Sequence, residues 1–150
     1  RIGEIAALKI SDVLAEDGAV RTVIQLTAAQ TKGREARTVR VSTQLQTELA
    51  AYLRTLSAER RAAQMPLITN KLGSAFSANG LCQLMLKLYD AAGLDRATSH
   101  STRRTFITTL AHKGVNVRVL AELAGHKTIS TTQRYIELNE NTLRAAVEMV

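Results

Sequence analysis

Three glycines divide the second half of the chain into short segments with helical patterns, and the positions of these glycines most limit the possible fold. Residue patterns with helical spacing predict helices over residues 77–92, 99–113, 116–124 and 130–135. The first three of these patterns stop at Gly93, Gly114 and Gly125, and glycine readily adopts the left-handed conformation that ends many helices. Serine or asparagine residues that can cap a helix stand at their starts. The sequence therefore predicts a series of short, capped helices, and Asn139 or Asn141 is predicted to open a last one.

The first half of the chain contains the one pattern that predicts β-structure. Residues 20–27 are rich in β-branched side chains, and residues 38–41 alternate, with Val39 and Val41 predicted to face inward. A polar turn with a glycine separates the two segments, so the sequence predicts a β-hairpin with Lys32 near its tip.

Helices are predicted on both sides of this hairpin. One runs over residues 1–9 and is expected to end at Ser11-Asp12. The other begins at Ser42 or Thr43 and carries an apolar stripe of Leu45, Leu49, Tyr52, Leu53 and Leu56. The predicted fold class is therefore mainly α with a small antiparallel β-sheet near the N-terminus (α+β), in one domain over residues 1–150.

The composition favours a partner with negative charge. The 150 residues include 45% hydrophobic residues, enough for a core, and carry a formal net charge of +7 with a pI of about 10.1. A domain this basic usually meets nucleic acid first and a membrane surface second. No signal peptide and no apolar run long enough to span a membrane is apparent, and the single cysteine, Cys82, suits a reducing compartment, so a cytoplasmic location is expected.

His100 and Arg103 form the first candidate site. They are three residues apart in a predicted helix, so both side chains share one face. A guanidinium group opposes a metal ion but offers a fork of donors to phosphate, and histidine can pass a proton near neutral pH. The pattern favours an oxyanion site, while a solvated basic helix start remains an alternative.

The segment from Leu120 to Tyr135 forms the second candidate site. A helix ends at Gly125, His126 follows in the turn, and a new helix carries Tyr135. Two short helices joined by a glycine turn also describe a helix-turn-helix DNA reader. In that alternative Thr131, Thr132 and Gln133 would face the bases, and Tyr135 would be a packing residue.

Taken together, these residues resemble the tyrosine recombinase family, which includes the phage integrases. Residues 1–8 are similar to the family's first-arginine helix, and Thr31-Lys32-Gly33 is similar to its hairpin lysine. His100 and Arg103 match its His-x-x-Arg box. Leu123-Ala124-Gly125-His126, followed nine residues later by Tyr135, matches its last box. The resemblance covers nearly the whole chain and departs from the family pattern inside the His-x-x-Arg box and just after it, at Ser101, Thr102 and Arg104.

The resemblance implies a site-specific recombinase or integrase that cuts and rejoins DNA by transesterification. Tyr135 would be the nucleophile and would form a 3′-phosphotyrosyl intermediate, without ATP, metal or other cofactor. In the implied roles Arg1 and Arg103 bind the non-bridging oxygens and His126 adds a donor. His100 is a candidate base for the Tyr135 proton, and Lys32 is a candidate acid for the leaving 5′ oxygen.

The resemblance also implies double-stranded DNA as partner and a homotetramer on paired DNA sites, linked by exchange of C-terminal tails. An apolar stripe at Leu143, Ala146, Val147 and Val150 suits such a tail, although it could instead pack on its own domain. Because residues 1–5 read as the middle of a helix without an initiator methionine, we expect a catalytic domain without the family's N-terminal DNA-binding domain. A type IB topoisomerase and a non-catalytic helix-turn-helix regulator are the rival functions.

Overall fold

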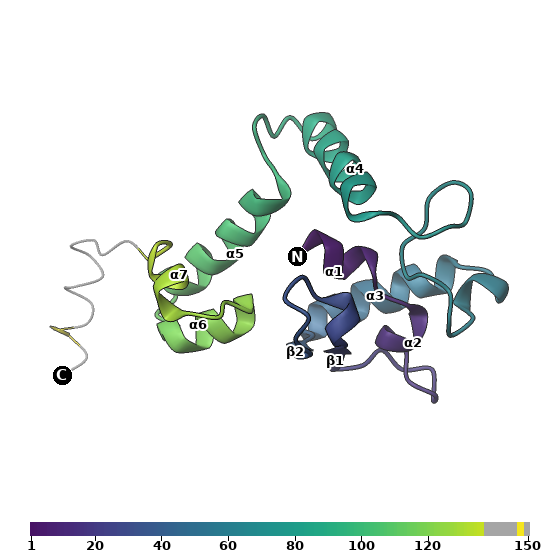
Figure 1. Cartoon of the computed structure of the whole chain (residues 1–150), viewed down its shortest axis with the longest axis horizontal. Helices are drawn as coiled ribbons and strands as arrows, with labels where there is room; N and C mark the ends of the chain where they lie inside the picture. The colour runs from purple at the N-terminus through teal and green to yellow at the C-terminus, as the bar shows by residue number, and fades with distance from the viewer. Residues whose placement is uncertain (137–146, 149–150) are drawn as a thin grey trace. The chain divides into compact units, whose positions relative to one another are not determined.

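The computed structural model describes residues 1–136 and 147–148 (Figure 1). Internal contacts divide the chain into two compact units, unit 1 (Arg1–Ser99) and unit 2 (His100–Val150), and each is described by itself. Nothing in the sequence pattern indicated this division, because no linker or low-complexity segment lies near residue 99.

Unit 1 contains the only sheet within the described residues. Its elements in chain order are α1 (Ile2–Ala6), α2 (Ile10–Val13), β1 (Val23–Leu26), the 3-10 helix η1 (Ala28–Gln30), β2 (Arg37–Arg40), α3 (Thr43–Thr55), the 3-10 helix η2 (Glu59–Arg61) and α4 (Ala78–Ala91). The prediction of a mainly helical fold with a small antiparallel sheet near the N-terminus is confirmed.

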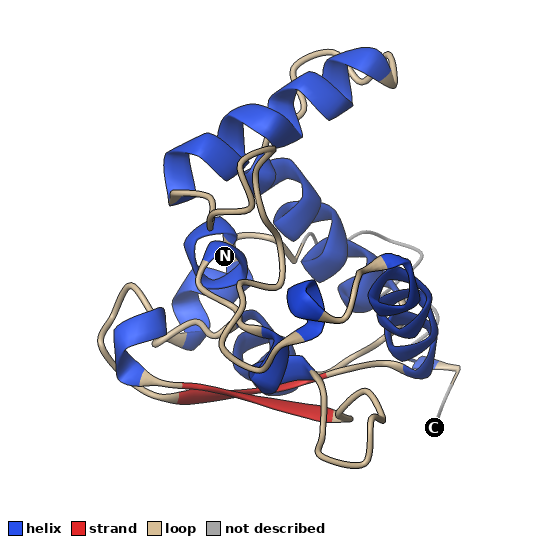
Figure 2. Cartoon of the chain, turned by 90° about the vertical axis from the view of Figure 1, so that its right-hand side faces the viewer, coloured by secondary structure: helices blue, strands red, loops and turns tan. Residues whose placement is uncertain are grey.

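The two strands form an antiparallel pair, drawn as the red arrows of Figure 2. Val23 pairs with Arg40 and Leu26 pairs with Arg37. Val39 and Val41 are partly or fully buried, whereas Thr38 and Arg40 are exposed, as the alternation in the sequence predicted. The hairpin is therefore confirmed, with β1 shorter than the predicted segment 20–27.

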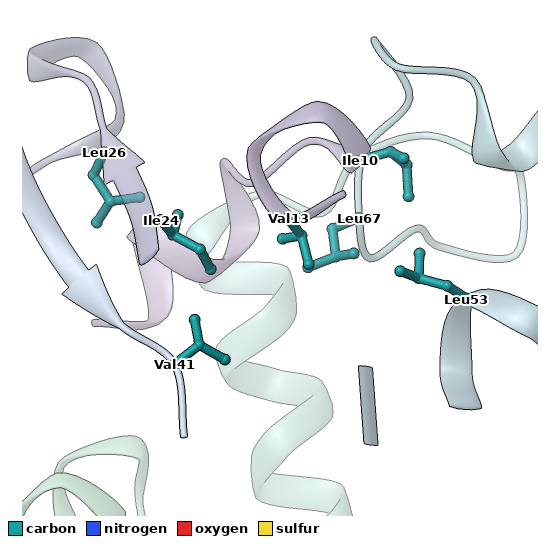
Figure 3. Packing of buried hydrophobic residues seen from close by; sticks show 7 residues of the cluster. All are labelled: Ile10, Val13, Ile24, Leu26, Val41, Leu53 and Leu67. Atoms are coloured by element: carbon teal, nitrogen blue, oxygen red, sulfur yellow. The ribbon is translucent and has the colours of Figure 1, made fainter. Parts of the chain in front are cut away.

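The core of unit 1 forms where the hairpin, α2 and α3 meet (Figure 3). Its buried members are all aliphatic: Ile10, Val13, Ile24, Leu26, Val41, Leu53 and Leu67. Burial of such side chains contributes about 1.5–3 kcal/mol each to folding. Tyr52 lies at the edge of this core, and its hydroxyl group donates a hydrogen bond to the Leu67 carbonyl at 2.9 Å.

Local capping determines where α3 and α4 begin, as predicted. The hydroxyl groups of Ser42 and Ser77 accept hydrogen bonds from the Leu45 and Gly80 amides, at 3.2 and 3.0 Å. Gly93, with φ of 68°, follows the end of α4. α4 packs against α1 within unit 1.

The single helix predicted over residues 1–9 is wrong in extent. α1 stops at Ala6, and Ser11-Asp12, predicted to end it, lies inside the separate helix α2. The reason is local, because the Asp12 carboxylate accepts a hydrogen bond from the Lys9 amide at 2.8 Å and so caps the start of a new turn.

Unit 2 is helical in its described part. It contains α5 (Ser99–His112), whose first residue falls in unit 1, α6 (Val117–Ala124) and α7 (Ile129–Gln133). Its buried residues are Ile107, Leu120, Ala121, Ala124 and Thr132. α6 begins at Asn116, whose side chain accepts a hydrogen bond from the Arg118 amide at 2.8 Å.

The last described helix differs from its prediction at both ends. Thr128 and not Ser130 occupies the position before α7, without a capping side-chain hydrogen bond. The helix ends at Gln133, so Tyr135 lies in the turn that follows it. The helix predicted to open at Asn139 or Asn141 lies outside the described residues, as does most of the C-terminal apolar stripe. Among the residues that the structure describes, no helix is both long and apolar enough to cross a membrane.

Candidate active site

The turn between α6 and α7 is built around one glycine. Gly125 ends α6 in the left-handed backbone conformation, with φ of 63° and ψ of 42°. Residues with a Cβ adopt this conformation only at a cost in free energy. The next residue, His126, donates its amide to the Ala121 carbonyl at 2.9 Å, so its backbone is held against the end of α6. The Leu-Ala-Gly-His box therefore determines where the His126 side chain leaves the main chain.

Arg103 joins this turn from α5. A terminal nitrogen of its guanidinium group donates a hydrogen bond to the Ala124 carbonyl, at the end of α6. The last carbonyls of a helix lack partners inside the helix and carry partial negative charge, so a guanidinium group is a favourable partner there. Arg103 thus holds the residue two before His126, and the two sequence boxes meet in one place.

The His126 ring contacts two residues that follow it. Its Nδ1 lies 2.8 Å from the hydroxyl oxygen of Thr132, which is fully buried in α7. The ring also stacks on that of Tyr135, with centroids 6.1 Å apart and planes 20° apart. The Tyr135 amide donates to the Thr132 carbonyl at 2.9 Å. His126 and Tyr135 therefore lie together.

His100 lies one turn before Arg103 on α5 and is exposed. The two residues share a helix at the predicted spacing of three. An exposed imidazole near the start of a helix is open to solvent and to a ligand, which suits the predicted role in proton transfer.

Positive charge dominates the described part of unit 2. Between residues 100 and 136 Glu122 is the one carboxylate, against the basic residues Arg103, Arg104, Lys113, Arg118, Lys127 and Arg134. A surface with this balance attracts a polyanion. Within the described residues no group of three or more His, Cys, Asp or Glu side chains could hold a metal ion.

In unit 1, Arg1 is held by a buried carboxylate. Its guanidinium group forms an ion pair with Glu4 at 3.2 Å, one helical turn away. Glu4 is only 4% exposed and also binds Arg37 of β2 through a second ion pair. Glu4 therefore connects the arginine at the start of α1 to the second strand of the hairpin.

The charge of Glu4 is favoured by these neighbours. Burial alone raises the pKa of a carboxyl group, but hydrogen bonding and nearby positive charge, with the Arg37 hydrogen bond as the largest of these effects, hold the Glu4 pKa below its ordinary value. Glu4 consequently stays ionised at neutral pH, although it is buried.

Lys32 lies exposed in the loop between the two strands, as predicted. The buried Thr31 closes this loop, because its hydroxyl oxygen lies 2.8 Å from the Glu35 carbonyl and accepts from the Glu35 amide at 3.1 Å. The Gln30 side chain donates to the Asp12 carboxylate at 2.7 Å and ties the base of the loop to α2. Lys32 thus extends from a loop with a fixed base.

Unit 2 brings together three predicted site residues, Arg103, His126 and Tyr135, with His100 on the same helix as Arg103. Arg1 and Lys32 belong to unit 1. Sequence reasoning missed Glu4, Arg37 and Thr132. The spacing of three between Arg1 and Glu4 could have identified Glu4, whereas no local signal links residues 4 and 37, or residues 126 and 132.

The helix-turn-helix alternative is wrong about Thr132. That alternative needed Thr132 to face DNA bases, but the side chain is 0% exposed and is bonded to His126. Only Thr131 and Gln133 of that set are exposed.

The fold and these residues define a class of DNA-rearranging proteins. The model of the phage integrase family matches residues 1–142, and the chain belongs to this family of tyrosine recombinases. It is 31% identical to the tyrosine recombinase XerA of Pyrococcus furiosus, over 99% of the chain and 49% of that protein. It is 32% identical to XerD of Corynebacterium glutamicum, over 96% of the chain and 46% of that protein. The chain spans about half the length of these curated relatives.

Solved structures agree on the fold, which is that of tyrosine recombinase catalytic domains. A crystal structure of XerA recombinase matches 99% of the chain and 51% of its own, with a TM-score of 0.76 and 27% identity. A post-cleavage complex of XerH recombinase with a palindromic difH substrate matches 98% of the chain and 41% of its own, with a TM-score of 0.69 and 25% identity.

Proposed function

We propose that residues 1–150 are the catalytic domain of a site-specific DNA recombinase that cuts and rejoins DNA through Tyr135. The observation that carries this proposal is the arrangement in unit 2, where the Tyr135 ring stacks on His126 and Arg103 binds the backbone two residues before His126. A DNA-binding domain would belong to the part of the full-length protein that the relatives have and this chain does not cover.

The chemistry requires a nucleophile, charge stabilisation and a proton for the leaving group. The Tyr135 oxygen attacks a DNA phosphorus, a 3′-phosphotyrosyl bond forms, and the bond to the 5′ oxygen breaks. A free tyrosine has a pKa of about 10, so roughly one part in a thousand is phenolate at pH 7. His100 takes the phenol proton, and Arg103 and His126 donate hydrogen bonds to the non-bridging oxygens.

Unit 1 supplies the remaining two groups. Arg1 binds the phosphate with Arg103, and Lys32 protonates the leaving 5′ oxygen. The ion pair with Glu4 supports this role for Arg1, because it fixes a long side chain that would otherwise lose conformational entropy on binding. The exposed position of Lys32 on an anchored loop supports its role as an acid that reaches into DNA.

Rejoining reverses the first step. A second DNA 5′-hydroxyl attacks the phosphotyrosyl bond, Tyr135 leaves, and the phosphodiester forms again in the exchanged strand. The covalent intermediate conserves the energy of the ester, so the reaction needs no ATP, and the cationic side chains supply the charge that a metal would supply.

The partner is double-stranded DNA, and the working assembly is a homotetramer on paired sites. A solved complex of XerH with its difH substrate supports DNA as the partner. The apolar stripe in the sequence of the C-terminal tail supports docking of this tail on a neighbouring protomer. Deletion of residues 140–150 should then leave the monomer stable and abolish tetramer assembly on paired sites. A large loss of monomer stability with normal assembly would show that the tail belongs to its own domain.

The decisive test is covalent capture. The full-length protein is incubated with a nicked suicide DNA substrate. After cleavage the short fragment that carries the free 5′-hydroxyl diffuses away, which prevents rejoining. We expect a covalent protein–DNA adduct, with the nucleotide mapped by mass spectrometry to the peptide that contains Tyr135. A specific footprint without an adduct would favour a non-catalytic DNA-binding regulator. Relaxation of supercoils by the monomer, without exchange between sites, would favour a type IB topoisomerase.

A further inference from the structure

We propose that Thr132 is a positioning residue for this reaction, whose buried hydroxyl group sets the orientation and the proton position of the His126 ring. The inference rests on the proposed function and deepens it, because it assigns a role to a residue outside the six that the sequence predicted. Thr132 is 0% exposed, and its hydroxyl oxygen lies 2.8 Å from Nδ1 of His126. A buried hydroxyl group is costly without a partner, so this bond defines the local structure.

The hydroxyl group is itself firmly held. Threonine is β-branched, so on α7 its side chain has few rotamers, and the position of its oxygen follows the helix backbone. Three contacts therefore constrain the His126 ring. The backbone amide of His126 donates a hydrogen bond to the Ala121 carbonyl, Thr132 contacts Nδ1, and the Tyr135 ring stacks on the face of the imidazole.

The 2.8 Å contact allows either group to donate, and the proposed role of His126 requires the hydroxyl group to be the donor. When the threonine hydroxyl donates to Nδ1, the neutral imidazole carries its proton on Nε2. The Nε2–H group is then a hydrogen-bond donor even without a positive charge on the ring. This is the form that a donor to a phosphate oxygen requires.

A hydroxyl group suits this position better than a carboxylate. Many functional histidines are oriented by a carboxylate at their second nitrogen, which also raises the basicity of the ring. At a DNA phosphate that carboxylate would place another negative charge near the anion under attack. Thr132 orients the ring without adding charge.

Thr132 also links the histidine to the nucleophile. Its side chain holds the His126 ring, and its main-chain carbonyl accepts the Tyr135 amide at 2.9 Å. One residue therefore determines where both groups lie relative to each other. Thr132 lies six residues after His126 and three residues before Tyr135, and the latter spacing is that of a hydrogen-bonded turn.

The test compares three variants of the full-length protein. Thr132→Val removes the hydroxyl group at nearly constant volume, and Thr132→Ser keeps it. Thr131→Val is the matched control, because Thr131 is an exposed neighbour on α7 whose hydroxyl contacts Thr128. Each variant is measured for single-turnover cleavage of the suicide substrate, for DNA affinity, and for melting temperature. ¹⁵N NMR of the His126 ring above its titration range reports the proton position.

We expect Thr132→Val to slow cleavage by about 10- to 100-fold, the range known for partners that orient metal-bound histidines. DNA affinity should change less than about twofold in the same variant, because the phosphate contacts remain. Thr132→Ser should restore cleavage to within a few-fold of wild type, and Thr131→Val should cleave normally. The wild-type ring should carry its proton on Nε2.

Wild-type cleavage by Thr132→Val, or equal loss in Thr132→Ser, would overturn the proposal, since the methyl group and not the hydroxyl would then matter. A neutral wild-type ring with its proton on Nδ1 would also overturn it, and this measurement does not depend on the folding of any variant. Absence of an adduct with wild-type protein would instead contradict the proposed function, while the NMR result would still decide how Thr132 orients the ring.

Discussion

The two units hold their candidate residues by different means. In unit 1, Arg1 is fixed by an ion pair to Glu4, and Glu4 is fixed by a second ion pair to Arg37. In unit 2, Arg103 binds a backbone carbonyl, and the His126 ring binds a hydroxyl group and a ring face. The comparison teaches that unit 1 depends on the ionisation of one buried carboxylate, whereas these contacts of unit 2 do not require a carboxylate.

The largest expected effect is that of losing the proposed nucleophile from unit 2. Tyr135→Phe removes the proposed attacking oxygen and little volume, so covalent adduct should fall below detection while DNA affinity stays within about twofold. Gel analysis of adduct and a binding titration check this. Tyr89→Phe in unit 1 is the matched control and should still form adduct. Formation of an adduct by Tyr135→Phe would show that Tyr135 is not the nucleophile of unit 2.

Loss of the candidate acid from unit 1 should have a smaller effect. Lys32→Ala should slow cleavage by about 10²- to 10⁴-fold, the range for general acid catalysis. A substrate with sulfur in place of the leaving 5′ oxygen should restore the rate, because a thiol with a pKa of about 8.5 leaves without an acid. Arg34→Asn, which removes a charge from the same loop at a left-handed position, should cleave sulfur and oxygen substrates in the wild-type ratio. If the sulfur substrate does not restore the cleavage rate of Lys32→Ala, then Lys32 binds DNA and does not act as the acid.

Loss of the Glu4 charge should affect stability in a pH-dependent way. Glu4→Gln should lower the free energy of unfolding of unit 1 by about 1–3 kcal/mol at pH 7, because Arg37 loses its charged partner. The folded pKa of Glu4 is lowered, so its contribution is present above the unfolded pKa and is lost as the pH falls through the folded pKa. Urea unfolding between pH 7 and pH 3 measures this.

In that experiment the wild type and Glu4→Gln should converge in acid. Glu48→Gln, an exposed position on α3, is the control and should change stability by less than about 0.5 kcal/mol. A Glu4→Gln effect that is equal at all pH values would mean that packing, and not charge, holds Arg1 and Arg37, and the contrast between the units would disappear.

The smallest expected effect is that of a chelator. Excess EDTA should leave the cleavage rate of the full-length protein unchanged, because in the proposed mechanism Arg1, Arg103, Lys32 and His126 supply the positive charge at the phosphate. Loss of cleavage in EDTA that added magnesium restores would contradict this site.

Local signals predicted much of the fold. Ser77, Asn116 and Gly125 act on residues within one turn of themselves, so the starts of α4 and α6 and the end of α6 were readable from the sequence. Contacts over longer separations were not readable. Arg37 and Glu4 are 33 residues apart in the sequence, and no residue pattern indicates that they are in contact.

The residues of the candidate site could be named from the sequence, whereas the contacts that hold them could not. The six residues were identified from spacing and family resemblance, and their roles stay predictions. Thr132 was missed because the turn at Gly125 interrupts helical spacing, so no period connects residues 126 and 132. The end of α7 before Tyr135 was missed for a similar reason, since no glycine or proline marks it.

The parallel rings of His126 and Tyr135 also give this chain an optical signal of its own. The sequence contains no tryptophan and three tyrosines, at positions 52, 89 and 135. With Phe at positions 52 and 89, ultraviolet emission would come from Tyr135 alone, beside an imidazole whose centroid is 6.1 Å away. Such emission responds to the distance and protonation of its neighbour, so the proposed nucleophile can act as its own unlabelled probe.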